Sequence, residues 1–112
     1  MSNSQIINKV KSILLLLIDK NYQQLVDNDA FKRLTAFEIE TAFAEFDGGC
    51  LTMLPNEYWE TMDIYYSDVV EGEVYVDVDL WFDNQLSDLT LQLTLTPQEN
   101  TIVYGIDDIR VL

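Results

Sequence analysis

The chain has 112 residues and a mass of 13.0 kDa, a length that fits one domain. Because 48% of the residues are hydrophobic, the chain can bury a core, and intrinsic disorder is excluded as its main state. Six Lys and Arg residues against 20 Asp and Glu residues give a formal charge of -14, the wrong sign for binding nucleic acid or an anionic membrane.

The sequence contains no histidine and one cysteine, Cys50. The commonest general base and zinc ligand are therefore excluded, as is an intramolecular disulfide. The apolar run 13–18 is too short to span a membrane, and no signal-peptide cleavage pattern follows it. Since this cysteine usage also fits a reducing compartment, we expect a cytoplasmic protein.

The first half of the chain has helical spacing. Apolar residues recur at three- and four-residue steps and predict a helix over 4–19 whose apolar stripe faces a core: Ile6, Val10, Ile13, Leu14, Leu17 and Ile18. A short helical turn is expected over 21–27. Thr35 and Glu38 have the spacing of a capping box, which predicts a third helix starting at Thr35 and ending near Gly48 and Gly49.

After Cys50 the apolar residues alternate, which is typical of half-buried antiparallel strands. The alternation predicts a short strand over 51–54, a single turn from Pro55 to Trp59, and strands near 62–67, 74–82, 89–96 and 101–112. The last strand changes its apolar phase at 105–107, which predicts a bulge. We expect Asp83 to pair with Asp88 across a four-residue turn, because this register places valines opposite leucines.

These elements predict an α+β fold, in which N-terminal helices cover one face of a four- to five-stranded antiparallel meander sheet. We expect a single domain over 1–112, with a helical part over about 4–48 and a sheet part over about 50–112.

Charge is divided unevenly along this arrangement. Residues 1–33 carry five cations and three acids, a net +2, whereas 34–112 carry one cation and 17 acids, a net -16. In the predicted register Ile64 pairs with Val76, so Asp63 lies opposite Asp77 and acids share the wet face with aromatic rings. Such a face suits a basic protein partner, although acids kept for solubility are the other interpretation. The candidate partner-binding residues are Asp63, Tyr65, Tyr75, Asp77, Asp79, Trp81, Asp83 and Asp88.

Other chemistries fit the sequence less well. Asp77, Asp79 and Asp83 lack the glycine and the terminal glutamate of an EF-hand loop, so we expect no metal site and no cofactor. Most carboxylates alternate outward rather than into a cleft, so we expect no enzyme activity. Tyr104 and Asp108, near the predicted bulge, are candidates for lining a cavity between helices and sheet together with Tyr22, although packing in the core is the favoured interpretation of Tyr104.

The chain resembles a family of small acidic bacterial domains in three segments: Asp77–Trp81, Ser87–Leu91 and Ile106–Leu112. Its order of elements is similar to that of the NTF2-like, or cystatin-like, α+β superfold. Small, strongly acidic proteins of this kind resemble the immunity proteins of polymorphic toxins and of contact-dependent growth inhibition. The resemblance implies a protein that neutralises a cognate toxin, often a basic nuclease, by occluding its active site or a surface it needs.

The expected function is therefore binding and neutralisation of a basic toxin domain through the acidic, aromatic face of the sheet. The alternative is an NTF2-like small-molecule binder or enzyme with a pocket between helices and sheet. We expect a monomer or weak dimer, because pairing two such faces would place like charges together.

Overall fold

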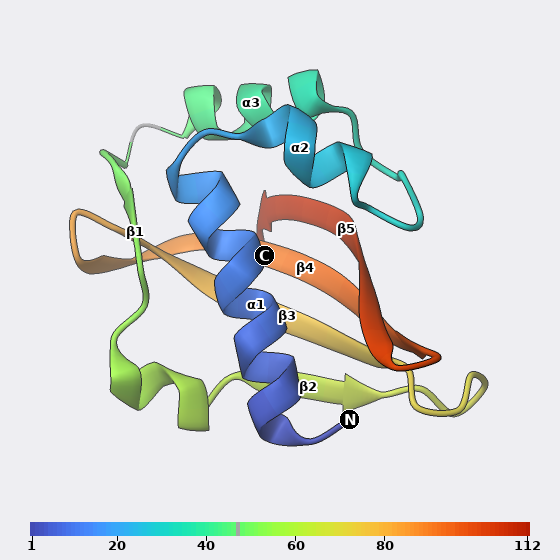
Figure 1. The fold of residues 1–112 in the computed structure, drawn as a ribbon. Coiled ribbons are helices and arrows are strands. Elements are labelled where there is room, and N and C mark those ends of the chain that lie inside the picture. The colour runs from blue at the N-terminus through green and yellow to red at the C-terminus, as the bar shows by residue number, and fades with distance from the viewer. Residues whose placement is uncertain (47) are drawn as a thin grey trace.

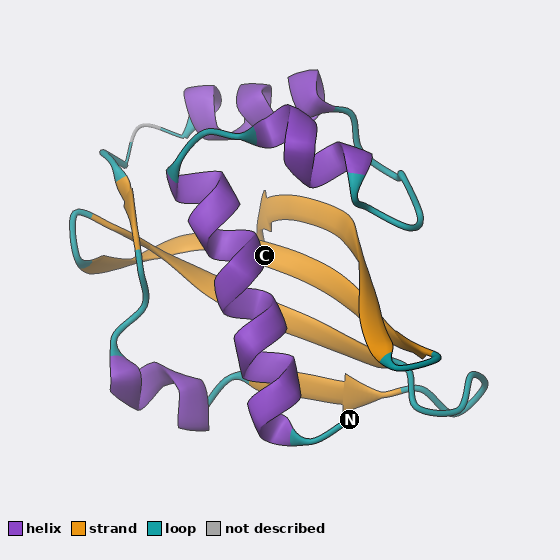
Figure 2. Cartoon of the chain, viewed as in Figure 1, coloured by secondary structure: helices purple, strands orange, loops and turns teal. Residues whose placement is uncertain are grey.

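The computed structural model describes residues 1–46 and 48–112 and has the predicted α+β class (Figures 1 and 2). Three helices precede five strands, and a 3-10 helix, η1, lies between the first two strands. In chain order the elements are α1 (Asn3–Ile18), α2 (Tyr22–Asp27), α3 (Ala36–Glu45), β1 (Leu51–Thr52), η1 (Asn56–Glu60), β2 (Asp63–Tyr66), β3 (Val74–Phe82), β4 (Gln85–Gln98) and β5 (Thr101–Val111).

The capping box at Thr35 is confirmed. The Glu38 backbone N–H donates to the Thr35 hydroxyl over 3.1 Å, and the Thr35 N–H donates to the Glu38 carboxylate over the same distance. The end of α3 differs from the prediction, because Phe46 already has extended backbone. Gly49 does adopt a left-handed φ of 97°, but it lies at the entry to β1 rather than directly after the helix. The predicted helical part also includes residue 47, which lies outside the described residues.

The sheet has the spatial order β1-β3-β4-β5, and β2 pairs with the same edge of β3 as β1 does. Helix α1 runs across one face of this sheet, while α2 and α3 lie beyond the β5 edge (Figure 1). Alternate residues of β3 and β4 are buried against α1, and they form the core with its apolar stripe. We call the opposite side of the sheet the outer face.

The predicted register between β3 and β4 is wrong by two residues over 74–79 of β3 and by four residues next to the turn. Val78 pairs with Leu91 and Val76 with Leu93, and the hairpin turn consists of Asp83 and Asn84 alone. Both turn residues have positive φ, 51° and 62°, as a type I′ turn requires. An irregularity between Asp79 and Trp81 absorbs the extra residues of β4. Because the displacement is an even number, every apolar side chain keeps its predicted face.

The bulge in β5 is confirmed, and a loop covers the adjoining edge of that strand. Asp107 is the extra residue, since Gln92 pairs with Asp108 and Leu93 with Ile106. The covering loop is 28–34, whose Ala30 N–H donates to the Tyr104 carbonyl over 2.8 Å. This loop removes part of an exposed strand edge that would otherwise invite pairing with another chain.

The buried carboxylate of Asp29 holds this loop to β5. It accepts backbone N–H groups from Phe31 at 2.7 Å, from Lys32 at 2.9 Å and from Ile106 at 2.9 Å, and the residue is only 3% exposed. Gly105 permits the close approach, because a side chain there would collide with the Phe31 ring.

Replacing Asp29 with Ala should lower the free energy of unfolding by about 3 kcal/mol, because three backbone donors lose a charged acceptor. Urea unfolding would measure the loss. The matched control is Asp27→Ala, at an exposed helical carboxylate that accepts only from the Gln23 side chain, and we expect it to cost at most about 0.5 kcal/mol. Equal losses in the two variants would contradict this account of the loop.

Candidate functional site

The outer face places acids and aromatic rings in two adjacent rows across the strands. The acidic row is Asp63, Asp77, Gln92 and Asp108, from β2 through β5, and the pairing of Asp63 with Asp77 is confirmed. The aromatic row runs from Tyr65 through Tyr75 to Thr94 and Gly105. Side chains directly opposite one another in neighbouring strands lie about 5 Å apart, so the members of each row are neighbours as far as Gly105, which has no side chain.

The predicted site residues differ in how far they reach solvent. Tyr65 and Tyr75 are 53% and 39% exposed, and Asp63 and Asp88 are also exposed. Asp77 and Asp79 are half-buried on the same face. The two tyrosines and their neighbouring acids therefore form the accessible centre of the outer face.

The prediction that Asp83 continues the row of acids along β3 is wrong, because β3 ends at Phe82. Asp83 is the first residue of the β3–β4 turn, and its carboxylate accepts the Cys50 backbone N–H over 3.2 Å. Its own N–H donates to the Cys50 carbonyl over 2.8 Å. Asp83 is thus committed to holding the segment before β1, because the tight turn redirects it away from the sheet.

Trp81 lies between Thr52 of β1 and Leu86 of β4 on the outer face, but it is only half exposed. Within the described part of the chain, its indole N–H is buried and meets no acceptor. An unpaired buried donor is unfavourable, and the enclosed ring offers less contact area than the tyrosines do. Tyr65 and Tyr75 are accordingly better placed than Trp81 to contact a partner.

Two cations reach this face among the described residues, and each lies beside an acid of the same chain. Arg33 extends from loop 28–34 to the Asp107 carboxylate, which also accepts from the Thr94 hydroxyl over 2.6 Å. Arg110 lies 3.7 Å from the Asp108 carboxylate. Neither ion pair includes Asp63 or Asp77, so the charge of that opposed pair is not neutralised locally.

Tyr58, which sequence reasoning did not single out, completes the edge of β3 beside these acids. Asp79 lies on β3 between the residues that pair with β2 and those that pair with β1. Its backbone N–H donates to the Tyr58 hydroxyl over 2.8 Å. Burial raises the pKa of Tyr58 to about 12; the Asp79 N–H bond opposes the rise, while the charges of Asp79 and Asp63 add to it. The predicted turn after Pro55 was the available signal, but the sequence did not show where its tyrosine would point.

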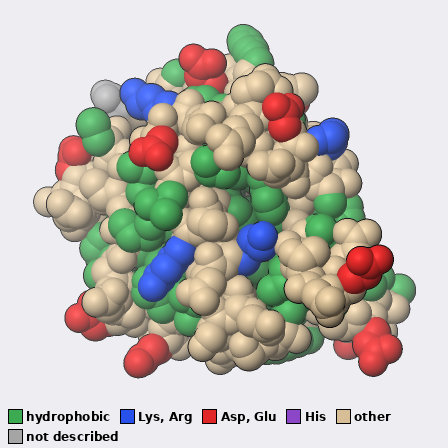
Figure 3. Space-filling view, viewed as in Figure 1, with side chains coloured by type: hydrophobic (Ala, Val, Ile, Leu, Met, Phe, Trp, Pro, Cys, Tyr) green, Lys and Arg blue, Asp and Glu red, His purple; other side chains and the backbone are tan. Residues whose placement is uncertain are grey.

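The α1 side of the molecule has a different character. Figure 3 shows basic side chains near the middle of this face and acidic ones mainly around its margin. Two α1 lysines lie over aromatic rings: the Lys9 ammonium is 5.9 Å from the Tyr104 ring centre and that of Lys11 is 5.2 Å from Trp59. A basic partner would therefore meet complementary charge on the outer face rather than on this one.

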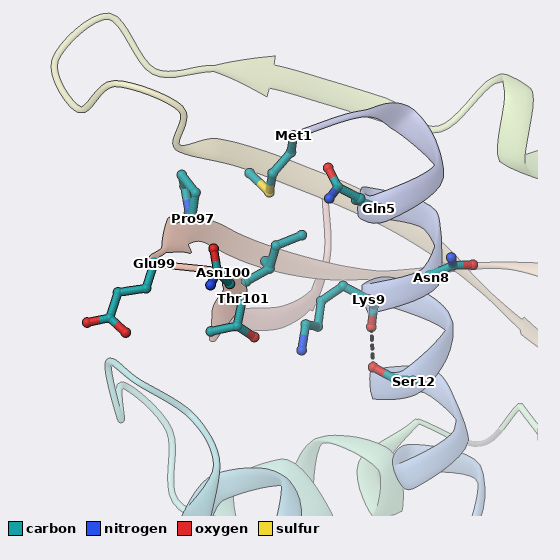
Figure 4. Close-up of a pocket in the computed structure, with 10 residues that line it drawn as sticks. Met1, Gln5, Asn8, Lys9, Ser12, Pro97, Glu99, Asn100 and Thr101 are labelled. Carbon is teal, nitrogen blue, oxygen red and sulfur yellow. Dashed lines mark hydrogen bonds between the residues drawn. The ribbon is translucent and has the colours of Figure 1, made fainter.

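A polar groove of about 700 Å³ lies between α1 and the β4–β5 turn (Figure 4). The Lys9 side chain extends from α1 toward Asn100 and Thr101 across it. The Ser12 hydroxyl at its border is already used, since it donates to the Lys9 carbonyl over 2.7 Å. The groove is wide and mostly polar, and it holds no nucleophile paired with a base.

A second hollow, here called the apical cleft, has a volume of about 440 Å³ and lies between the helices and the β1 end of the sheet. Tyr22 lines it, as the sequence had suggested for a cavity of this kind. Tyr104 and Asp108 do not: the Tyr104 hydroxyl donates to the Leu25 carbonyl in the core, and Asp108 lies on the outer face. These three side chains therefore do not converge on one cavity, and the favoured interpretation of Tyr104, packing in the core, is confirmed.

Within residues 1–46 and 48–112, no group of three or more Asp, Glu or Cys side chains is arranged to hold a metal ion. None of the helices in these residues combines the length and the apolarity needed to cross a bilayer.

The geometry defines a small α+β domain with an acidic, aromatic sheet face. A family model described as Domain of unknown function (DUF7668) matches residues 14–112, and the chain belongs to this family. Comparison with curated proteins and with solved structures gave no match.

Replacing Tyr58 with Phe should reduce the loss of stability at alkaline pH. The folded pKa lies above the ordinary value of 10.0, so the unfolded chain releases the phenol proton first and the free energy of unfolding falls between about pH 10 and about pH 12. Urea unfolding of the variant at pH 8 and about pH 11 should show a shallower decline. Tyr66→Phe, at an exposed ring, controls for loss of a phenol, and an unchanged decline in Tyr58→Phe would contradict the assignment.

Replacing Asp63 with Asn should raise the free energy of unfolding by about 0.5 kcal/mol, because it removes a like charge directly opposite Asp77. The gain should shrink at high salt, where screening already weakens the repulsion. Asp68→Asn removes the same charge from the exposed loop between β2 and β3, and should gain less. A lower free energy of unfolding in Asp63→Asn would show that repulsion between the two carboxylates does not limit stability.

Proposed function

We propose that this protein is a non-enzymatic binding protein, specifically an immunity protein that neutralises a cognate basic toxin domain. The observation that supports the proposal is the outer face, where exposed Tyr65 and Tyr75 border the opposed carboxylates of Asp63 and Asp77. A cationic partner would relieve the repulsion between these acids and pack against the rings.

The distribution of charge favours a protein partner over a metal ion. The carboxylates are spread along a flat strip on several strands, whereas a metal site needs them to converge on one point. Lys and Arg side chains of a partner can meet separate acids at separate points. The rings supply the apolar contact area typical of residues that dominate binding energy.

The assignment to immunity proteins rests on the sequence resemblance together with this face. In the proposal the protein acts in the cytoplasm as a monomer or weak dimer, and occludes the active site or a required surface of a basic toxin such as a nuclease. The exposed thiol of Cys50 fits a reducing compartment. The relation to the NTF2-like superfold stays a prediction.

The test begins with the partner recovered from the native host, purified and shown to bind the unmodified protein. The double variant Asp63→Asn/Asp77→Asn should associate about tenfold more slowly, because charge complementarity acts mainly on the association rate. Surface plasmon resonance at two salt concentrations would measure this rate. Tyr65→Ala should weaken affinity by about 2 kcal/mol if the ring is an anchor.

The matched control is Glu57→Gln/Asp68→Asn, which changes the net charge equally at exposed positions outside the two rows. It should bind nearly as the unmodified protein does, and equal effects of the two double variants would rule out the outer face. Immunity itself requires that the partner stop growth of cells when expressed alone and that co-expression restore growth. A partner without toxicity would contradict immunity.

A further inference from the structure

The apical cleft exists because α3 does not close fully over the rest of the fold. On α3, Ile39 is completely buried but Phe43 is only half-buried, and so is Phe46, which directly follows the helix. The N-terminal part of α3 therefore packs into the core, whereas its C-terminal part stands over an open space that separates it from β1. Apolar surface left beside such a space remains available to an apolar ligand.

Three aromatic rings lie in the walls of this space. Tyr22 of α2 and Phe43 of α3 lie nearly parallel, with ring centres 6.1 Å apart and an angle of 7°. The ring centre of Phe82, at the end of β3, lies 6.2 Å from that of Phe43. Leu17 and Leu51 complete the apolar lining from α1 and β1. Because Tyr22 and Phe43 already stack on each other, a flat apolar ring would contact the edges and outer faces of these rings.

Charge at the cleft indicates a neutral ligand. Lys20 and Glu40 both line it, so the local charges are of opposite sign and favour neither an anion nor a cation. The net charge of -14 disfavours an anion further. Burial raises the pKa of Tyr22, and the charge of Glu40 adds to the rise, so its phenol stays protonated and can donate a hydrogen bond.

We propose that the apical cleft is a binding site for a small, uncharged aromatic molecule that packs against Tyr22, Phe43 and Phe82. The volume of about 440 Å³ lies within the range of pockets that hold small ligands, roughly 300–1,000 Å³. This site is separate from the outer face and does not depend on the proposed partner.

Indole is a suitable probe, because it is flat, uncharged and carries one hydrogen-bond donor. Titration of the isotopically labelled full chain, followed by NMR, should give saturable amide shifts concentrated in α2, α3 and β1. Cys50 provides a second readout, since it is the single cysteine, is exposed and lines the cleft. Its rate of alkylation by iodoacetamide should fall as indole saturates the site.

Ala44→Phe should weaken indole binding about tenfold or more, because the new ring occupies the cleft from an exposed position on α3 where it does not disturb the core. Phe43→Ala, which removes the stacking ring without filling space, should weaken it comparably. Phe37→Leu is the control, since Phe37 lies on α3 but is exposed to solvent outside the cleft. Far-UV circular dichroism would confirm that each variant folds.

Three results would overturn the proposal: no saturable shifts with the unmodified protein, shifts that persist unchanged in folded Ala44→Phe and Phe43→Ala, or indole-independent alkylation of Cys50. Variants of the outer face such as Tyr65→Ala should leave indole binding unchanged. The absence of toxin neutralisation and the absence of indole binding are thus separate outcomes, and each contradicts only its own proposal.

Discussion

The leucines of β4 pack between the valines of β3 and the apolar stripe of α1, and this burial determines which face of the sheet each side chain occupies. Because side chains alternate along a strand, burying Leu91 and Leu93 places Thr90, Gln92 and Thr94 on the outer face, where Gln92 is half-buried and both threonines are buried. Cross-strand pairing then carries the same division to β2 and β3. The gathering of acids and tyrosines on one face is therefore a consequence of how the core is built.

Because the acids gather on the outer face, their carboxylates repel one another where few cations of the chain lie nearby. On the outer face Arg33 and Arg110 lie beside Asp107 and Asp108, at the β5 side of the sheet, whereas Asp63 and Asp77 lie at the β2 side. Opposed carboxylates reduce stability, and surfaces that retain such a conflict are frequently those on which binding depends. An acidic surface kept only for solubility would not need its acids to face one another beside exposed tyrosines.

Short-range sequence patterns correctly predicted the features that depend on neighbouring residues or on a single apolar face. The capping box at Thr35, the alternation of β3, the pairing of Asp63 with Asp77 and the β5 bulge all depend on residues close in sequence or on one apolar face. The contacts of Asp29 with Ile106 and of Tyr58 with Asp79 join segments distant in sequence. Such contacts depend on the assembled fold, so no spacing rule predicted them, nor the half-closed cleft beside α3.

The misplaced hairpin turn has consequences beyond register. Matching leucines to valines cannot distinguish two registers that differ by an even number of residues, so the turn itself had to decide between them. Asp83 and Asn84 both tolerate a left-handed backbone, and the two-residue turn they form brings the Asp83 carboxylate to the Cys50 N–H. This bond fixes the segment that forms one wall of the apical cleft, while Phe82, the residue before the turn, forms another. A four-residue turn would have left Asp83 paired within the sheet and the Cys50 N–H without its acceptor. The two-residue turn therefore both removes an acid from the outer face and helps to form the cleft.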